Sequence, residues 1–451
     1  MRRLFGTDGI RGIANEYLSC ERAVQIGRAL GTVLSSNHKY RPKVLIGMDT
    51  RISSEMLASA ITSGLCSVGS DVLALGVVPT PAVAYLVKKY KAKAGIMISA
   101  SHNPYKYNGI KIFGEDGFKL SDELEEEIEA IVLDENPPVK LAASLEIGKR
   151  ADASYAVHDY ISYLMTTTDT RLDGMRIAID ALNGAASATA ERLFSGLGAD
   201  VTVLFDKPTG TNINEGCGST HLDSLKSCVI ENELDVGIAF DGDADRCLAV
   251  DEMGREIDGD FIMAILALDM KNKGELNKNT VVGTVMSNYG FERFCEENGI
   301  KFISAKVGDR YVLELINRED YSFGGEQSGH IIIRKHATTG DGQLTAIALL
   351  SHIKDSGKKL SSLASVMKKY PQNTINISAT QEQKIALFTD EEIREVLRRA
   401  EEQLSGHGRI VVRPSGTEPL IRIMVESCDT SETKALAEKV AAAINERLLC
   451  Y

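Results

Sequence analysis

The 451-residue sequence lacks the features that mark several classes of protein. No apolar run approaches the ~18 residues of a membrane-spanning helix, and the start Met-Arg-Arg-Leu-Phe-Gly has no signal-peptide core. Basic residues are not in excess either. The formal net charge is −12, which argues against non-specific binding to nucleic acid and against binding to an anionic membrane surface. We therefore expect a cytoplasmic protein that binds neither nucleic acid nor a membrane.

The sequence also lacks paired cysteines, internal repeats and low-complexity segments. None of its eight cysteines stands in a C-x-x-C pair or at metal-finger spacing. We expect them to be scattered, buried thiols in a reducing compartment. The eight are Cys20, Cys66, Cys217, Cys228, Cys247, Cys295, Cys428 and Cys450.

Segments typical of strands alternate with segments typical of helices along most of the chain. This alternation indicates sheets with helices on both faces, and the length predicts about three domains at ~150 residues each. After Tyr370-Pro371 the pattern changes to that of a small α+β domain. We predict three consecutive α/β domains with mixed sheets and a smaller C-terminal α+β domain, around a central cleft. Their predicted ranges are 1–153, 154–257, 258–370 and 371–451.

A serine-rich loop follows a buried strand near residue 98. Gly95 to Ile98 is a short apolar run, and Ser99-Ala100-Ser101-His102-Asn103-Pro104 then ends regular structure. Open α/β sheets bind their ligands just past the carboxyl ends of such strands. Residues 110–113 alternate like a returning strand and bring Lys111 beside the loop. Taken alone, the segment is more simply interpreted as a serine-rich turn that caps a helix.

Two other charged segments have simple structural interpretations. Thr7-Asp8-Gly9 is a turn that allows close backbone approach, and Arg11 after it has the donors for bidentate binding of phosphate. An ordinary hairpin turn with an exposed arginine is the alternative. The acidic run 123–129 indicates a solvated helix face more simply than a metal site.

A loop with three carboxylates follows the buried strand at residues 234–240. Asp241, Asp243 and Asp245 are costly to hold together unless a positive charge lies among them, and a hard divalent cation is the natural partner. An EF-hand is excluded, because a strand precedes the loop and Arg246 stands where that motif has glycine. The loop fits Mg²⁺ with room for phosphate oxygens. An acidic loop paired with Arg246 is the alternative.

Two loops further along carry groups suited to sugars and phosphates. Glycines at 324, 325 and 329 allow close approach, while Glu326, Ser328 and His330 can bind or protonate hydroxyl groups. In the last domain, Arg413-Pro-Ser-Gly-Thr-Glu-Pro419 and Arg422 combine two arginines, two hydroxyls and the amides of a glycine turn. This set is suited to a phosphate dianion. An exposed β-turn is the alternative for the second loop.

These four loops, in this order and at this spacing, resemble the α-D-phosphohexomutase superfamily over essentially the whole chain. The resemblance implies that Ser101 carries the transferred phosphoryl group. It also implies that Asp241, Asp243 and Asp245, together with the phosphorylated serine, hold one Mg²⁺ per chain. Glu326 and Ser328 would orient sugar hydroxyls. The residues that would hold the phosphate that is not reacting are Arg413, Ser415, Gly416, Thr417 and Arg422.

Within the superfamily the chain is most similar to the phosphoglucosamine mutase branch. The similarity rests on Phe-Gly-Thr-Asp-Gly-Ile-Arg-Gly at the start, on Gln327, and on the segment 307–311 with Asp309 and Arg310 as substrate-binding residues. It implies interconversion of glucosamine 6-phosphate and glucosamine 1-phosphate through a phosphoserine and a 1,6-bisphosphate, which also serves as primer. The product would feed synthesis of UDP-N-acetylglucosamine and cell-wall precursors. Tyr105-Lys106-Tyr107 departs from the branch.

The resemblance leaves the proton acceptor and the substrate open. We expect Lys111 to be the general base, with His330 as the alternative, although the aspartates oppose the lowered pKa that a basic lysine requires. Arg11, His102 and Arg246 are expected around the phosphoryl group. A phosphomannomutase or phosphoglucomutase is the nearest alternative, followed by a phosphohydrolase and a non-catalytic sugar-phosphate sensor. The sequence allows a homodimer but does not determine the oligomeric state.

Overall fold

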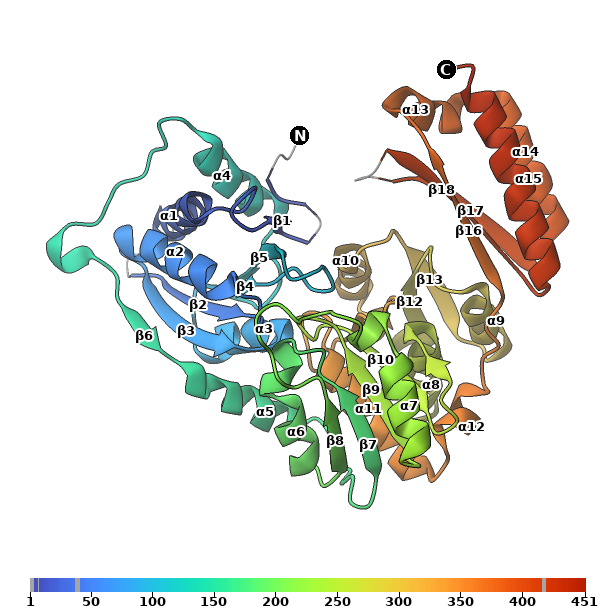
Figure 1. Ribbon diagram of the computed structural model, residues 1–451, viewed down its shortest axis with the longest axis horizontal. Helices are drawn as coiled ribbons and strands as arrows, with labels where there is room; N and C mark the ends of the chain where they lie inside the picture. Colours follow the sequence, from blue (N-terminus) through green and yellow to red (C-terminus); the bar gives the residue numbers. More distant parts are fainter. Residues whose placement is uncertain (1–3, 7, 37–40, 416–418) are drawn as a thin grey trace. The chain divides into compact units, whose positions relative to one another are not determined.

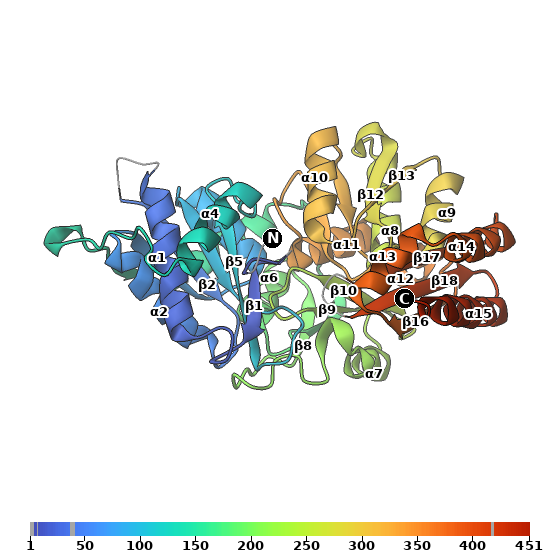
Figure 2. The same ribbon diagram turned by 90° about the horizontal axis from the view of Figure 1, so that it is seen from above.

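The computed structural model describes residues 4–6, 8–36, 41–415 and 419–451. By contacts the chain divides into two units. The first comprises residues 1–284 and 305–365, and the second comprises residues 285–304 and 366–451. Three sheets of the first unit and one sheet of the second carry the candidate site residues (Figures 1 and 2). No helix within the described ranges has the length and apolar character needed to cross a membrane.

The first sheet is mixed and has the strand order β1-β5-β4-β2-β3-β6. Its central strands β3, β2 and β4 are parallel, whereas β5 runs antiparallel to β4 and to β1. The parallel strands are nearly continuous apolar runs because both faces of the sheet are covered. The strands are β1 (Ile10–Ile13), β2 (Lys43–Met48), β3 (Asp71–Val77), β4 (Ala94–Ile98), β5 (Tyr107–Gly114) and β6 (Arg150–Asp152).

Helices α1 (Cys20–Ser36), α2 (Ser54–Ser67) and α4 (Asp122–Leu133) share one hydrophobic core with this sheet. Figure 2 shows α1 and α2 side by side over the strands. Helix α3 (Thr80–Lys89) packs on the sheet through Val83 and Val87, which approach Gly47 and Gly95. Tight packing on both faces fixes where β4 ends, and so fixes the loop that begins at residue 99.

The acidic run on α4 is not a wholly solvated face, so that prediction is wrong for two of its residues. Glu125 and Glu129 are buried. The Glu129 carboxylate accepts hydrogen bonds from the amides of Leu4 and Phe5, at 2.9 and 3.1 Å. These bonds offset the cost of burying the charge and hold the N-terminal segment against the first sheet.

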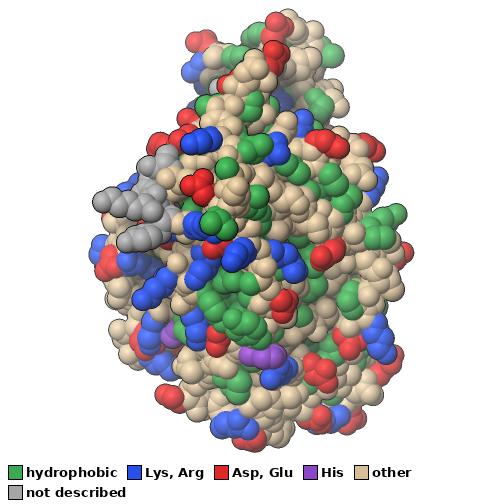
Figure 3. Space-filling model, turned by 90° about the vertical axis from the view of Figure 1, so that its left-hand side faces the viewer, with side chains coloured by type: hydrophobic (Ala, Val, Ile, Leu, Met, Phe, Trp, Pro, Cys, Tyr) green, Lys and Arg blue, Asp and Glu red, His purple; other side chains and the backbone are tan. Residues whose placement is uncertain are grey.

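The segment between α4 and β6 carries exposed apolar side chains. Leu141 and Ile147 are exposed, and Leu145 is 91% exposed in a short 3₁₀ turn (Ser144–Glu146). Arg41 donates hydrogen bonds to the carbonyl oxygens of Leu145 and Ile147. Figure 3, which shows this side of the molecule, places basic and apolar side chains next to one another.

The second sheet, with strand order β11-β10-β9-β7-β8, is also mixed. Strands β8, β7 and β9 are parallel, and β10 is antiparallel to β9 and β11. Helices α5 (Val157–Met165), α6 (Ala190–Gly196) and α7 (Asp223–Glu231) accompany it (Figure 1). The strands are β7 (Arg176–Asp180), β8 (Asp200–Leu204), β9 (Val236–Phe240), β10 (Cys247–Asp251) and β11 (Glu256–Ile257).

The third sheet of the first unit contains β12 (Thr280–Thr284), β14 (Phe323–Gly325) and β15 (Ile331–Ile333). Strands β12 and β14 are parallel, and β14 and β15 form an antiparallel pair around the loop 326–330. The helices of this part are α8 (Gly259–Asn272), α10 (Asp309–Glu319), α11 (Gly342–Ser356) and α12 (Leu360–Ala364).

The second unit has an antiparallel sheet of β16 (Gln372–Ser378), β18 (Leu420–Ser427) and β17 (Gly408–Pro414), in that order. Helices α14 (Glu391–Leu404) and α15 (Thr430–Leu448) bury their apolar faces against it, together with α13 (Gln381–Thr389). The segment 285–304 adds α9 (Tyr289–Glu297) and most of β13 (Lys301–Ala305). The prediction of three mixed α/β domains and a smaller α+β domain is thus confirmed, whereas the predicted domain boundaries stay a prediction.

All eight cysteines are free thiols, as expected, but the expectation that they are buried holds for only some of them. Cys217, Cys247 and Cys295 are buried, whereas Cys428 and Cys450 are exposed. The last two lie just after β18 and just after α15, where the polypeptide turns at the surface.

Candidate active site

Ser101 lies in the loop that connects the buried strand β4 to β5. Its side chain is buried, and its hydroxyl group donates a hydrogen bond of 2.5 Å to Asp241 Oδ2. Its backbone amide donates to the hydroxyl oxygen of Ser99, at 2.9 Å. The residue has a φ of +50°, which is uncommon for a side chain other than glycine. The loop therefore presents one particular hydroxyl to a carboxylate from another sheet, which the bland interpretation as a capped turn does not explain.

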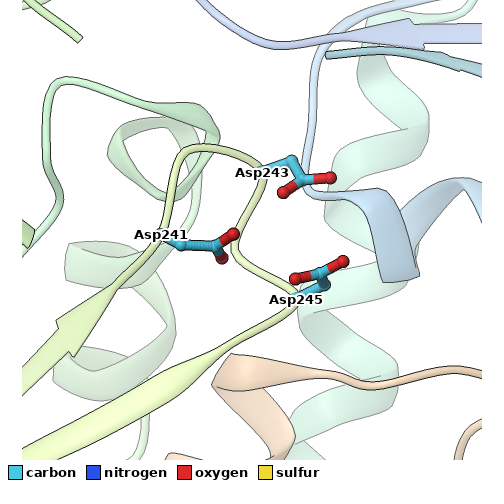
Figure 4. Close-up of side chains that lie close together, drawn as sticks. All are labelled: Asp241, Asp243 and Asp245. Carbon is cyan, nitrogen blue, oxygen red and sulfur yellow. The ribbon is translucent and has the colours of Figure 1, made fainter. Parts of the chain in front are cut away.

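The three predicted aspartates lie on the six-residue loop between β9 and β10 (Figure 4). They are buried, and one carboxylate oxygen from each lies within 4.8 Å of the others. The Oδ1 atoms of Asp243 and Asp245 are buried and accept no hydrogen bond from any described residue. Buried carboxylate oxygens that receive no hydrogen bond from the described residues are suitable ligands for a hard cation. The three aspartates therefore fit the expected Mg²⁺. The alternative of an exposed acidic loop does not fit their burial.

Gly242 explains how the two loops approach each other. A Cβ atom at this position would lie 2.2 Å from the carbonyl oxygen of Ser101. Only glycine therefore lets the aspartate loop pass this close to the serine loop.

Lys111, on β5, supplies the positive charge among the aspartates. Its ammonium group is buried and donates to Asp243 Oδ2 at 2.6 Å and to Asp245 Oδ2 at 3.2 Å. Burial by itself lowers the pKa of Lys111, but the carboxylates of Asp243 and Asp245 outweigh it and hold the pKa above its usual range. Lys111 is therefore a cation in this arrangement. Its role as general base stays a prediction.

His330 faces the aspartate loop from the third sheet. Its backbone forms a β-bridge with Arg246, and its Nδ1 atom lies 3.5 Å from Asp245 Oδ1. Burial opposes protonation, but the carboxylates of Asp245 and Asp309 raise the pKa of His330 to about 9. The backbone amide of Gly340 donates to Nε2 at 3.1 Å, and this bond requires a lone pair on that atom. In this arrangement the Gly340 bond therefore requires the neutral ring, with its proton on Nδ1, the nitrogen on the side of Asp245.

The other predicted groups around the phosphoryl centre lie on three loops. Arg246 donates its amide to Asp241 Oδ1 at 3.1 Å. His102 is exposed as a whole residue, but the Nδ1 side of its ring is partly buried and lies 3.4 Å from the Ser101 hydroxyl oxygen. Partial burial, followed by the charges of Arg246 and Arg11, lowers the pKa of His102 to about 4. Arg11 pairs with Asp8 at 3.3 Å, while its buried Nε has no hydrogen-bond partner among the described residues. The structure thus leaves Arg11 partly buried, with 24% of its side chain exposed, unlike the exposed arginine of the alternative interpretation.

The predicted sugar-binding residues are engaged with one another or with the first sheet. Glu326 accepts from the amide of Gly308 at 3.0 Å and from the Ser328 hydroxyl at 3.4 Å. Asp309 accepts from Lys119 at 2.6 Å, and Arg310 forms an ion pair with Asp122. A cavity of about 580 Å³ beside them is lined by polar residues that include His330, and by apolar side chains of α1, α4 and α10.

The predicted phosphate-binding residues belong to the second unit. Arg413 and Arg422 are directly opposite each other on the antiparallel strands β17 and β18. Burial and then the charge of Arg422 lower the pKa of Arg413. The amide of Ser415 donates to the carbonyl oxygen of Leu420, and the carbonyl oxygen of Ser415 accepts from Lys384 at 2.6 Å. Gly416 and Thr417 lie outside the described residues.

Sequence reasoning missed several residues that hold this site together. Thr80, the first residue of α3, donates its hydroxyl to Asp243 Oδ2 at 2.5 Å and its amide to the Asp243 carbonyl oxygen at 2.9 Å. Lys119 contacts Asp309, and Arg51 and Asn214 contact the serine loop. The sequence could have pointed to Arg51, because it belongs to the polar residues that directly follow the buried strand β2 at its carboxyl end. Nothing in the sequence pointed to Asn214, because its loop has no periodic pattern.

Comparison with known proteins places these four loops in one family. Family models of the phosphoglucomutase/phosphomannomutase group match residues 2–138 (alpha/beta/alpha domain I), 158–254 (domain II), 258–370 (domain III) and 375–443 (C-terminal domain). The phosphoglucosamine mutase of Acetivibrio thermocellus is 49% identical over 99% of this chain and 100% of its own length.

This chain belongs to the phosphoglucomutase/phosphomannomutase family. Further relatives that carry the name phosphoglucosamine mutase are 48–51% identical over 99% of the chain. Solved members of the family share the fold. A phosphoglucomutase/phosphomannomutase family protein from Burkholderia thailandensis, 22% identical, has a TM-score of 0.81 over 98% of this chain and 97% of its own.

A second solved structure is that of the N-acetylphosphoglucosamine mutase from Aspergillus fumigatus. It is 16% identical, with a TM-score of 0.64 over 92% of this chain and 85% of its own, and it was solved with GlcNAc-6P and magnesium. At this identity the likeness concerns the fold. The ligands of the present chain, also a member of the phosphoglucomutase/phosphomannomutase family, are therefore assigned from its own residues.

Proposed function

We propose that this enzyme interconverts glucosamine 6-phosphate and glucosamine 1-phosphate, with Ser101 as the phosphoryl carrier. The observation that carries the proposal is the Ser101 hydroxyl, held at 2.5 Å from Asp241 on a carboxylate loop suited to Mg²⁺. Full-length relatives at about half identity carry the name phosphoglucosamine mutase, which supports the amino sugar as substrate. The product would supply synthesis of UDP-N-acetylglucosamine in the cytoplasm.

The proposed reaction has two half-reactions at the same serine. First, the bond from phosphorus to Ser101 Oγ breaks, a bond to a free sugar hydroxyl oxygen forms, and the hydroxyl proton passes by way of a base to Ser101 Oγ, which leaves as a hydroxyl group. The resulting 1,6-bisphosphate then turns round and returns its other phosphoryl group to Ser101. When bound to Asp241, Asp243 and Asp245, Mg²⁺ offsets the charge on the transferred group.

The other residues bind and orient the substrate in this proposal. Arg11, His102 and Arg246 surround the phosphoryl group, and Arg246 is fixed by its amide bond to Asp241. Glu326, Ser328, Asp309 and Arg310 hold the sugar, which requires them to exchange the internal contacts described above for contacts with hydroxyl groups. The residues that hold the second phosphate are Arg413, Ser415, Gly416, Thr417 and Arg422.

A substrate panel tests the proposal most directly. The 6-phosphates of glucosamine, glucose and mannose are compared in coupled assays with Mg²⁺ and a trace of sugar 1,6-bisphosphate. We expect the highest kcat/KM with the glucosamine compound. Higher values with glucose or mannose phosphate would assign the chain to phosphoglucomutases or phosphomannomutases. Release of inorganic phosphate at the rate of turnover would indicate a phosphohydrolase, and full activity of Ser101→Ala would exclude a phosphoserine mechanism.

The proton acceptor needs its own experiment. Lys111 can accept the hydroxyl proton only in its neutral form, so the proposal requires that Asp243 and Asp245 bind Mg²⁺ in place of the ammonium group, whose pKa then falls. His330 is the alternative. Arginine keeps the positive charge beside Asp243 and Asp245 but does not give up its proton. We therefore expect Lys111→Arg to lose most of kcat while retaining its fold by circular dichroism, and His330→Gln to lose less. The opposite order would assign the base to His330.

The assembly is a further part of the proposal. The proposal allows a homodimer, and light scattering after size-exclusion chromatography distinguishes it from a single chain. A particle mass close to the 49.0 kDa of one chain would contradict the dimer.

A further inference from the structure

A buried ion pair after β2 is attached to the serine loop at several points. Asp49 and Arg51 are each at most 2% exposed, and Arg51 Nε donates to Asp49 Oδ2 at 2.8 Å. The rest of the guanidinium group is directed at backbone carbonyl oxygens. Nη2 donates to Ser101 at 2.7 Å, and Nη1 donates to Pro104 at 2.6 Å and to Tyr107 at 3.0 Å. One side chain thus spans the loop from its reactive residue to the start of β5.

The carboxylate of this pair fixes the other side of the same peptide. Asp49 Oδ2 also accepts from the Ser99 hydroxyl at 2.7 Å, and the Ser99 oxygen accepts from the Ser101 amide at 2.9 Å. Asp49 Oδ1 accepts from the Ser54 hydroxyl at 2.8 Å, which ties the pair to α2. One buried ion pair therefore holds both sides of Ser101. Arg51 binds its C=O group directly, and Asp49 holds its N–H group through the Ser99 hydroxyl.

A second anchor comes from a different sheet. Asn214, in the loop after β8, directs its amide nitrogen to the carbonyl oxygens of Ser101 at 2.9 Å and Asn103 at 2.8 Å. The backbone of Asn214 itself has a φ of +63°, in the left-handed region that asparagine tolerates better than most residues. Ser101 O thus receives two donors, one from the first sheet and one from the second.

These contacts account for the unusual backbone of Ser101. A non-glycine residue with positive φ is strained and persists only where its surroundings enforce it. Arg51 and Asn214 draw the carbonyl groups of the loop to one side, so the Ser101 hydroxyl is left pointing at Asp241. Neither residue contacts the reacting atoms, so each acts through Ser101.

We propose that Arg51 and Asn214 are positioning residues that set the orientation of the Ser101 hydroxyl for phosphoryl transfer. The inference rests on the proposed function, in which Ser101 is the carrier. Transfer depends steeply on geometry, because a displacement of ~1 Å at a reacting group can cost about 100-fold in rate. Binding of the sugar and of the second phosphate uses other residues, so loss of an anchor lowers kcat and leaves KM nearly unchanged.

Asn214→Asp is the sharpest test. The side chain keeps its shape, but an acceptor replaces the amide donor against two carbonyl oxygens. Asn212→Asp is the matched control, because Asn212 lies in the same loop and its side chain bonds to Lys207 and Thr209 within that loop. Its carbonyl oxygen accepts from Asn183. We expect kcat of Asn214→Asp to fall about 100-fold, with KM within about twofold of the wild type. Asn212→Asp should retain the wild-type kcat.

Arg51→Lys tests the other anchor, since lysine keeps the charge but lacks the planar fork that reaches three carbonyl groups. Arg176→Lys is its control, because Arg176 also donates to two carbonyl oxygens, those of Asn232 and Glu233, at a turn outside the site. Circular dichroism verifies folding. If Arg51→Lys does not fold, the Asn214 variants alone decide the proposal.

Two further readouts separate positioning from stability. The rate at which glucose 1,6-bisphosphate phosphorylates Ser101, followed by intact-mass spectrometry, should fall in Asn214→Asp in parallel with kcat. Its thermal midpoint should shift no more than that of Asn212→Asp. The ³¹P resonance of the phosphoserine should also move in Asn214→Asp and not in the control.

The outcomes distinguish the inference from the function on which it rests. If wild-type protein acquires no phosphate on Ser101, the proposed function is wrong. If the wild type is phosphorylated and Asn214→Asp equals it in kcat, phosphorylation rate and ³¹P shift, the positioning role is wrong. A fall in kcat that is matched by an equal fall in thermal midpoint would also overturn it, because a general loss of structure would then suffice.

Discussion

The two regions that carry candidate phosphate-handling residues treat positive charge in opposite ways. In the first unit the buried cations face carboxylates: Lys111 donates to Asp243 and Asp245, and Arg51 to Asp49. In the second unit Arg413 faces another arginine, Arg422, across two paired strands. Within the described part of the chain, Arg413 makes no ion pair.

This difference indicates which region is complete before a ligand arrives. Opposite charges in the first unit hold the serine and aspartate loops in one arrangement without any phosphate. Like charges directly opposite each other in a sheet are destabilising, so the second region gains from an anion that lies between them. The first region is thus preorganised for chemistry, whereas the second is suited to binding that depends on the charge of the ligand.

The largest expected effect comes from removing the central cation of the first region. Breaking a buried ion pair by deleting one partner costs about 3–5 kcal/mol, because the remaining charge stays buried. We expect Lys111→Met to lose that much free energy of unfolding in urea titrations with EDTA, and to recover part of it with Mg²⁺. Lys93→Met is the control, because its pair with Glu115 is at the surface and should cost less than about 1 kcal/mol. Equal losses of unfolding free energy in Lys111→Met and Lys93→Met would show that the buried ion pair stabilises the protein no more than a surface pair, which would remove the contrast between the two regions.

A second buried carboxylate of the first unit, Asp341, sharpens the comparison, because no ion pair with it is formed by any described residue. Asp341, at the start of α11, accepts from the Leu344 amide and the Tyr160 hydroxyl, and burial raises its pKa to about 6 from an ordinary value of 3.8. A raised pKa means that its contribution to stability is fully present below the lower value and is lost as the pH rises through the higher one. Asparagine does not titrate.

We therefore expect Asp341→Asn to gain stability relative to the wild type between pH 4 and 7. Two pKa units correspond to about 3 kcal/mol. Urea unfolding at several pH values measures the gain, with Asp134→Asn as the exposed control. A difference in unfolding free energy that does not change with pH would show that burying the charged form of Asp341 costs no stability.

Loss of Arg413 tests the charge-dependent binding proposed for the second region. A hydrogen bond to a charged group contributes about 1.5–3 kcal/mol, so Arg413→Ala should bind sugar phosphate about 10–100-fold more weakly. Isothermal titration calorimetry measures this. Arg394→Ala, on the exposed face of α14 in the same unit, should bind like the wild type. Unchanged affinity of Arg413→Ala would remove Arg413 from the phosphate site.

The smallest effect concerns stability without ligand. Relief of the repulsion between Arg413 and Arg422 should stabilise Arg413→Ala by about 0.2–1 kcal/mol in a buffer of low ionic strength without phosphate. Salt should shrink the gain, since the screening length falls to about 8 Å at 0.15 M. Thermal unfolding across a salt series follows both. A destabilised variant would indicate that packing of the arginine stem outweighs the repulsion.

Much of this arrangement was accessible from the sequence, because local patterns carried it. The apolar run before Asp241 predicted β9, and the polar residues after it correctly predicted a cluster of three carboxylates. The position of a serine-rich loop after β4 was predicted in the same way, whereas the choice of Ser101 within that loop came from the family resemblance. Helix α13 was missed although its capping box, Thr380 with Gln383, was readable before a weakly amphipathic segment.

The contacts that organise the site were not accessible, because they join residues far apart in the chain. Thr80 bonds to Asp243 across 163 residues, and Asn214 bonds to Ser101 across 113. Periodicity describes one element at a time and says nothing about which loop meets which. Buried glutamates posed the same difficulty: Glu129 belongs to an acidic run, and the amides of the distant residues Leu4 and Phe5 help to make its burial favourable.

The distance between Ser101 and Asp241 along the chain has a consequence for synthesis. The hydroxyl and the carboxylate that holds it are 140 residues apart and belong to different sheets. At roughly 5–20 residues per second, a ribosome needs about 7–28 s to make that stretch. During this time the first sheet can fold, yet its serine has neither the aspartates nor Asn214 beside it. A nascent chain therefore carries no working phosphoryl carrier. Ser101 becomes able to carry the phosphoryl group in one step, when the second sheet docks.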